Sequence, residues 1–333
     1  MFEIKKVVQQ AAILLAVFCI SDLIAGNSKA YINGSIHTFD ENLTVTESIL
    51  VKDGVIELVG SQADIIKNAD ESIEIVDLQG RMMMPSFHDA HAHPIWNGMD
   101  FLQCSVFDLL TINEIQDRIR ACLEEDHVKT SGWVVGAGLN AGLFPAANPN
   151  KSLFDEVSED IPIYIEMSDG HNALVNTKAL ELAGINRDTK DPFKGIIERD
   201  PITGEPSGTL REPSAMNLIA DVLPTETSEL RLNGLIYAQN LASSFGITSM
   251  IDAAVNEPYL ISFKDLAEKG ELNLRVTACI EYGRQHYVQE FSGFEDVYKR
   301  RSEFEHPRIN TNCVKIFIDG VLEGQTGAIL EPY

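Results

Sequence analysis

Two histidines stand one residue apart in the segment Pro85–Pro94, with a third histidine and an aspartate just before them. In an extended chain, residues two apart point to the same side, so His91 and His93 are expected to project together. The apolar run Met82-Met83-Met84 predicts a short buried strand that leads into them. Two adjacent imidazoles make up half of a coordination shell for a divalent metal. A pair of ordinary loop histidines is the alternative, and the neighbouring polar residues favour the metal.

The segment Pro85–His93 resembles the first-strand signature of the metal-dependent amidohydrolase superfamily, and most closely its YtcJ-like branch, amidohydrolase family 3. Ser86 stands where the family pattern has glycine, which leaves the ligand positions unchanged. The resemblance extends from about Tyr31 to Tyr333. It implies that His91 and His93 hold a divalent metal cofactor, one or two zinc ions, in an enzyme acting on a small-molecule substrate.

A lysine stands inside the apolar segment Val314–Ile318, near the end of the sequence. Its charge is unfavourable in an apolar strand unless it is matched or removed. Lys315–Gly320, followed by Gly324–Gly327, resembles the family segment that carries a carboxylated lysine, a carbamate bridging two metal ions. The resemblance therefore implies that Lys315 is a metal ligand. A lysine whose amine reaches solvent at a strand end is the alternative.

A further histidine follows an apolar strand expected at 162–167, in Ser168-Asp169-Gly170-His171. A histidine after glycine at a strand end is suited to point into a cleft. Together with Asn176–Leu180, this segment resembles a second YtcJ-like motif. The resemblance implies that His171 contacts the substrate or the developing oxyanion, and a structural histidine beside the next helix is the alternative.

These resemblances imply hydrolysis of a non-peptide carbon–nitrogen bond, in an amide or a cyclic amide, by metal-activated water. In the family, two more histidines and an aspartate that acts as general base follow the carboxylated lysine. The remaining histidines of this chain precede Lys315 and match no family ligand position: His127, His286 and His306. We therefore expect a chain truncated at its C-terminus, whose own activity stays open. Deamination or ester hydrolysis on the same fold, and an inactive exported protein, are the alternatives.

Strand and helix patterns alternate from Met82 onward, which predicts an α/β fold. The resemblance implies an incomplete TIM-like (β/α) barrel at 81–333, preceded by a small β-sandwich portion at 31–80. A glycine-punctuated hairpin near 190–212 is similar to a family insertion. Arg211 and Glu212 at its end are expected to be a surface pair, and contact with the substrate is the alternative. A helix is expected at 226–245, and Asp252, after the next strand pattern, is expected to be a turn carboxylate.

The N-terminal segment 1–30 has Lys5 and Lys6, an apolar stretch at 11–20 and then small residues. This pattern predicts a signal peptide or an N-terminal anchor, and hence export to the periplasm or outside the cell. The apolar stretch is short for a membrane span, and we expect no other membrane contact.

The 333 residues carry a formal net charge of −24, which opposes nucleic-acid binding because that function needs a basic surface. A homodimer is left open. Outside the leader, four cysteines are scattered without any Cys-x-x-Cys spacing: Cys104, Cys122, Cys279 and Cys313. We expect buried free thiols, although export permits disulfides.

Overall fold

The computed structural model describes residues 28–282, 294–319, 322 and 327–331. The chain divides into two compact units, Met1–Ser86 and Phe87–Tyr333. The predicted leader, residues 1–30, lies outside the described residues except for its last three positions, and His286 also lies outside them. Within the described ranges, no helix is long and apolar enough to cross a membrane.

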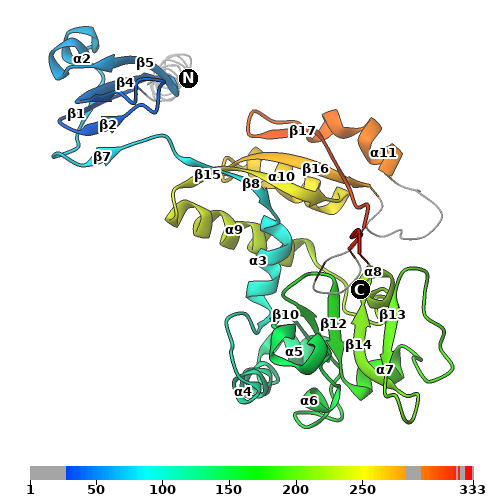
Figure 1. Cartoon of the computed structure of the whole chain (residues 1–333). Coiled ribbons are helices and arrows are strands. Elements are labelled where there is room, and N and C mark those ends of the chain that lie inside the picture. Colours follow the sequence, from blue (N-terminus) through cyan, green and yellow to red (C-terminus); the bar gives the residue numbers. More distant parts are fainter. Residues whose placement is uncertain (1–27, 283–293, 320–321, 323–326, 332–333) are drawn as a thin grey trace, which may run out of the picture. The chain divides into compact units, whose positions relative to one another are not determined.

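The first unit contains two small sheets, with strand orders β5-β4-β1-β6 and β3-β2-β7 (Figure 1). Its elements are β1 Lys29–Ile32, β2 Ser35–His37, β3 Val45–Thr46, β4 Ser48–Lys52, β5 Val55–Gly60, α2 Gln62–Asn68, β6 Glu74–Asp77 and β7 Met82–Met83. Strands β4 and β5 form an antiparallel hairpin. Its tip residues Asp53 and Gly54 have φ of 50° and 78°, the left-handed backbone that an Asp-Gly turn supplies.

One prediction about this region is wrong. Met82 and Met83 pair with β2 in the first unit, and Met82 is 62% exposed, so this run is not a buried strand leading into the histidines. The two histidines instead belong to β8 (Phe87–Ala92) and the position after it, at the start of the second unit. An apolar run of three residues is too short to predict its own burial.

The first sheet of the second unit has the order β17-β16-β15-β8, and all its strands are parallel (Figure 1). Its other strands are β15 Ile247–Val255, β16 Arg275–Tyr282 and β17 Ile309–Ile316. Three helices pack with it: α3 Pro94–Leu102, α9 Ser228–Ser244 and α10 Glu257–Glu268. Their shared core includes Ile95, Leu235, Phe263 and Ile280. Parallel strands direct their carboxyl ends to one edge, where site residues are expected.

Helix α9 confirms the helix expected at 226–245, because Thr227 caps it by accepting a hydrogen bond from Leu230 N at 3.0 Å. The apolar side chains of this segment are only partly buried. Leu235 is fully buried, whereas Leu241 and Phe245 are exposed. A close approach of glycines fixes the crossing of α3 and α9, since a Cβ added to Gly98 would lie 2.1 Å from the carbonyl oxygen of Gly234.

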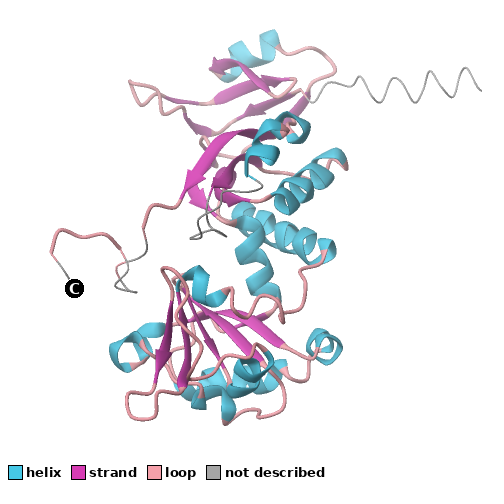
Figure 2. Ribbon diagram, turned by 90° about the vertical axis from the view of Figure 1, so that its right-hand side faces the viewer, coloured by secondary structure: helices cyan, strands magenta, loops and turns pink. Residues whose placement is uncertain are grey.

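The second sheet has six strands, in the order β13-β14-β12-β11-β10-β9. It is the lower of the sheets drawn in Figure 2, where helices lie beside it. These strands are β9 Cys104–Ser105, β10 Val134–Leu139, β11 Ile163–Met167, β12 Asn172–Val175, β13 Ile196–Arg199 and β14 Pro206–Arg211. Strands β9 to β11 are parallel, and β12 to β14 add an antiparallel half that includes the β13–β14 hairpin. Ile165 and Tyr164 enter different core clusters, so the sheet is covered on both faces.

The remaining helical elements surround these sheets. They are α4 Ile112–Cys122, α5 Asp126–Ser131, η1 Ala141–Leu143, η2 Pro145–Ala147, α6 Ser152–Asp155, α7 Thr177–Leu182, α8 Glu212–Met216, α11 Phe294–Lys299 and η3 Arg301–Phe304. The mixed α/β class is therefore confirmed. The described strands of the second unit form two sheets and no closed barrel. The TIM-like barrel and the β-sandwich stay predictions, because alternating patterns do not determine which strands pair.

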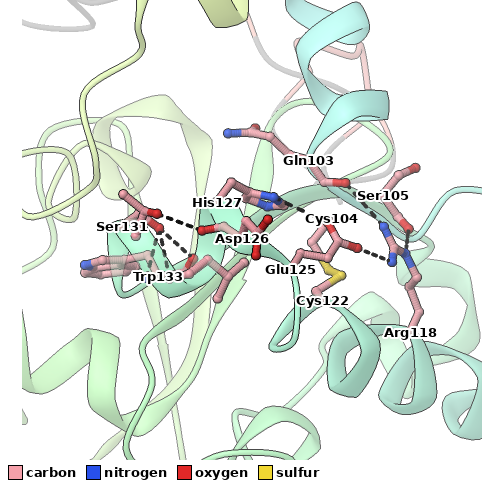
Figure 3. A network of polar contacts seen from close by, with 12 residues as sticks. Gln103, Cys104, Ser105, Arg118, Cys122, Glu125, Asp126, His127, Ser131 and Trp133 are labelled. Carbon is pink, nitrogen blue, oxygen red and sulfur yellow. Dashed lines mark hydrogen bonds and ion pairs between the residues drawn. A yellow bond between two sulfur atoms is a disulfide. The ribbon is translucent and has the colours of Figure 1, made fainter.

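The four cysteines form two disulfides, so the expectation of free thiols is wrong. Cys279 and Cys313 lie opposite each other on β16 and β17. Cys104 of β9 bonds to Cys122 at the end of α4 (Figure 3). In the same region Arg118 donates hydrogen bonds to the carbonyl oxygens of Gln103 and Ser105. The bonded cysteines are 18 and 34 residues apart in the chain, so the pairing depends on tertiary structure and could not be predicted from local spacing.

Candidate active site

A cavity of about 270 Å³ in the second unit is lined by all four site residues predicted from the sequence: His91, His93, His171 and Lys315. Three carboxylate residues also line it: Asp100, Glu166 and Asp169. Aromatic rings form part of its wall: Trp96, Phe107 and Phe317. A concave site with an apolar wall and converging polar groups is the usual form of a small-molecule site.

The histidine pair lies at the carboxyl end of β8. His91 is in the strand, and His93 is the residue before α3, whose first position is Pro94. The two rings are 5.3 Å apart between centroids and nearly perpendicular. Loss of water around the ring, and then the charge of Lys315, lower the pKa of His91 from its usual value. The neutral imidazole that results has the free lone pair that a metal requires.

Asp252 stands behind His93. It lies in β15, paired with Ala92 of β8, and is 1% exposed. Its Oδ1 is 3.6 Å from Nδ1 of His93. The expectation of a turn carboxylate is therefore wrong, because the strand continues to Val255 and buries the side chain. Carboxylates in this position commonly orient the histidine ligands of metals. Its place near a strand end was the signal that could have identified it.

Lys315 enters the cavity from β17, with β15 and β16 between its strand and β8. The lysine is half-buried rather than enclosed, because β17 is the edge strand and its neighbour Ile316 is 57% exposed. Its Nζ lies 4.8 Å from the centroid of the Phe317 ring. The amine thus reaches the same space as the histidine pair while its stem packs along the strand.

His171 is positioned by a tight turn after β11. Oδ1 of Asp169 accepts hydrogen bonds from the backbone N–H of His171 at 2.8 Å and of Asn172 at 3.1 Å. Gly170 has a φ of 68°, and a Cβ there would lie 3.3 Å from the Trp96 ring. Glycine therefore permits both the turn and the close approach to the cavity wall.

Glu212 is the residue that contacts His171. Its Oε2 lies 3.0 Å from Nδ1 of the imidazole. Glu212 is 3% exposed and Arg211 8%, so the expected surface pair is wrong. Arg211 instead forms an ion pair with Glu198. The sequence signal for their burial was that Arg211 ends the strand pattern of β14, Pro206–Arg211, and that Glu212 follows it directly. All of β14 is buried.

The side chains present fit part of a metal site. His91 is biased to its neutral form, and the buried Nδ1 of His93 has no hydrogen-bond partner among the described residues other than the approach of Asp252. Two such imidazoles suit a divalent metal with nitrogen ligands. Within the described ranges, no cluster of three or more His, Cys, Asp or Glu side chains is arranged to hold a metal ion.

Two other histidines within the described residues have partners elsewhere. His127 lies beside Glu125, with Nδ1 3.4 Å from the carboxylate (Figure 3). Nδ1 of His306 accepts a hydrogen bond from the backbone of Arg308.

Comparison with known proteins gives one matching family model. It is described as an amidohydrolase family, and it matches residues 74–333. The N-substituted formamide deformylase of Arthrobacter pascens is 28% identical over 297 residues, covering 86% of this chain and 54% of that protein. The putative amidohydrolase YtcJ of Bacillus subtilis (strain 168) is 28% identical over 303 residues, covering 90% and 55%. The chain thus spans about half the length of these curated relatives.

A solved structure resembles the fold. It is that of an uncharacterized metal-dependent hydrolase from Pyrococcus horikoshii OT3, with a TM-score of 0.65 and 25% sequence identity. The match covers 90% of this chain and 56% of that one.

Proposed function

Because the chain belongs to the amidohydrolase family, we propose that it acts as a metal-dependent hydrolase of a carbon–nitrogen bond outside peptides, in an amide or a cyclic amide of a small molecule. The observation that carries the proposal is the single cavity lined by His91, His93, His171 and Lys315. The formamide deformylase among the relatives acts, by its name, on an amide, which supports the choice of bond.

The metal ligands in this proposal are His91, His93 and Lys315, with Lys315 as its carbamate. Carboxylation replaces a cationic amine by an anion, so the repulsion between Lys315 and a metal ion becomes attraction. Zinc suits the two imidazoles. A divalent ion bound there supplies Lewis acidity, which polarises a carbonyl group and lowers the pKa of water.

The side chains of this chain then have separate tasks. Asp252 fixes the ring of His93 through Nδ1, which leaves Nε2 toward the cavity. His171 donates a hydrogen bond to the substrate carbonyl oxygen or to the oxyanion that develops from it. Trp96, Phe107 and Phe317 exclude water from the wall of the cavity and strengthen these polar interactions.

For the fold, we propose that the four parallel strands β8, β15, β16 and β17 are one wall of a TIM-like barrel, and that the sheets of the first unit form a β-sandwich portion. The likeness to the Pyrococcus horikoshii structure supports this. We also propose export to the periplasm or beyond. The leader pattern and the two disulfides support that location, since disulfides persist in oxidising compartments.

The test is hydrolysis by the full chain after reconstitution with zinc. A panel of N-substituted formamides, N-acyl amino acids and cyclic amides is assayed by release of the amine or by ring opening. We expect one class to be hydrolysed, with a loss of more than about 100-fold in His93→Ala and none in His127→Ala, whose ring lies beside Glu125. Equal rates for His93→Ala and the native chain, or no hydrolysis of any class by the zinc-loaded chain, contradict the proposal.

A further inference from the structure

We propose that Glu212 is a positioning residue: it holds the imidazole of His171 through Nδ1 and thereby leaves Nε2 as the nitrogen that serves the substrate. The catalytic consequence rests on the hydrolase proposed above, whereas the coupling of the two side chains stands on their contacts alone.

The two residues are joined twice. The carboxylate Oε2 of Glu212 lies 3.0 Å from Nδ1 of His171, and the backbone N–H of Glu212 donates to the carbonyl oxygen of His171 at 2.7 Å. The sheet register explains why they meet. Strands β12 and β14 are antiparallel with Asn172 opposite Arg211, so the residues just beyond this pair, His171 and Glu212, emerge side by side. Backbone and ring of His171 are therefore held by the same residue.

The carboxylate of Glu212 is buried and depends on the His171 ring for its hydrogen bond. The side chain of Glu212 is 4% exposed and that of His171 18%. The second oxygen, Oε1, is buried without a hydrogen-bond partner, so among the described residues the imidazole is the single side-chain partner of this carboxylate. The neighbouring cation, Arg211, forms an ion pair with Glu198. A buried carboxylate needs a hydrogen-bonded counterpart, and Nδ1–H of His171 supplies it.

The backbone at Glu212 is strained as well. Its φ is 67°, in the left-handed region that a non-glycine residue seldom adopts, and Pro213 follows it directly. The strained conformation brings the residue onto His171, because the same N–H makes the bond to the His171 carbonyl. Glu212 thus combines a strained backbone with a buried oxygen that has no hydrogen-bond partner, and it contacts a histidine that lines the cavity. Strain of this kind is often found at functional sites.

The chemical result follows from the two ring nitrogens. With Nδ1–H donating to Glu212, the neutral ring presents an unprotonated Nε2 to the cavity. The imidazolium presents Nε2–H to the cavity while Nδ1–H still donates to Glu212. In the cationic form His171 can donate to a carbonyl oxygen or an oxyanion while Glu212 fixes its direction. Without the carboxylate the ring can rotate or change its tautomer.

Nuclear magnetic resonance of the full chain, labelled with ¹⁵N at histidine, tests the coupling without metal or substrate. The His171 signals are assigned by their absence in His171→Asn. We expect a proton on Nδ1 in the native chain, and loss of that preference in Glu212→Gln, which keeps the size of the side chain. Glu198→Gln is the matched control, since it removes the carboxylate that pairs with Arg211 in the same hairpin, and should leave the His171 signals unchanged.

Kinetics with the hydrolysed substrate class test the consequence. We expect Glu212→Gln to lower kcat by about 10- to 100-fold with little change in KM, because the lost interaction forms in the transition state. It should add no further loss in the His171→Ala background. If the neutral His171 ring of the native chain carries its proton on Nε2, the positioning role is overturned. This result comes from the native chain alone, so it decides the question even if Glu212→Gln does not fold. The chain could instead show an Nδ1 proton on His171 that depends on Glu212 and yet hydrolyse none of the substrate classes. That result supports the coupling of the two residues and refutes only the proposed function.

Discussion

Nδ1 of His93 and Oδ1 of Asp252 lie 3.6 Å apart at the carboxyl ends of two neighbouring parallel strands. The aspartate is 1% exposed and the buried histidine nitrogen has no other partner among the described residues. At 3.6 Å the two atoms are in contact but too far apart for a hydrogen bond. The carboxylate is therefore placed where it can orient the ring of His93, a proposed metal ligand.

Replacing this carboxylate tests its role. Asp252→Asn keeps the size of the side chain and removes the charge behind His93, so zinc affinity is expected to fall about 10- to 100-fold. Competition with a chromogenic chelator measures the affinity. Asp117→Asn is the control, because that side chain is 76% exposed and pairs with Arg120 on the surface. Equal zinc affinity in Asp252→Asn and the native chain contradicts the orienting role.

The proposed carboxylation of Lys315 predicts that zinc binding depends on bicarbonate. Zinc binding by the native chain should strengthen when bicarbonate is added to buffer depleted of carbon dioxide, because the carbamate is the anionic ligand. Lys315→Ala should bind zinc more weakly and ignore bicarbonate. Lys269→Ala, which changes an exposed lysine at the end of α10, should behave as the native chain does. The idea fails if native zinc binding is the same at both bicarbonate levels.

The glycine contact between α3 and α9 predicts a large effect from one methyl group. In Gly98→Ala the new Cβ would meet the Gly234 carbonyl oxygen at 2.1 Å, so the helices must separate. The free energy of unfolding should fall by about 1–3 kcal/mol, as for other overpacked cores. Urea unfolding followed by circular dichroism measures it. Gly60→Ala is the control, because its Cβ would meet a side chain only at 3.8 Å; similar stability of both variants argues against the close approach.

The Cys104–Cys122 bond closes a loop of 18 residues. Replacing both cysteines by alanine should lower the free energy of unfolding by about 3 kcal/mol, the loop-closure contribution for this length. Chemical denaturation with and without reductant measures the change, and reductant should have a smaller effect on the double variant than on the native chain. Peptide mapping of the oxidised chain provides the direct check, and free thiols at both positions would rule the bond out.

The sequence predicted the features that depend on neighbouring residues. The alternation in β8 brings His91 and His93 together, and the helix expected at 226–245 forms as α9. The features that it did not predict depend on which elements pack together. Met82 is exposed because β7 is short and pairs within the first unit.

The same limit applies to the site. Asp252 is buried because β15 passes next to β8. Glu212 reaches His171 because β14 lies beside β12. Cys279 meets Cys313 because β16 and β17 are neighbours in register. None of these contacts has a signature in local spacing, since each joins residues far apart in the chain.

The most direct test of the central claim is anomalous diffraction at the zinc edge from crystals of the full chain grown with zinc and bicarbonate. We expect an anomalous peak in the cavity, within bonding distance of His91 and His93, with density for a carbamate on Lys315. A zinc peak confined to other histidines, or a cavity without a peak at saturating zinc, would contradict it.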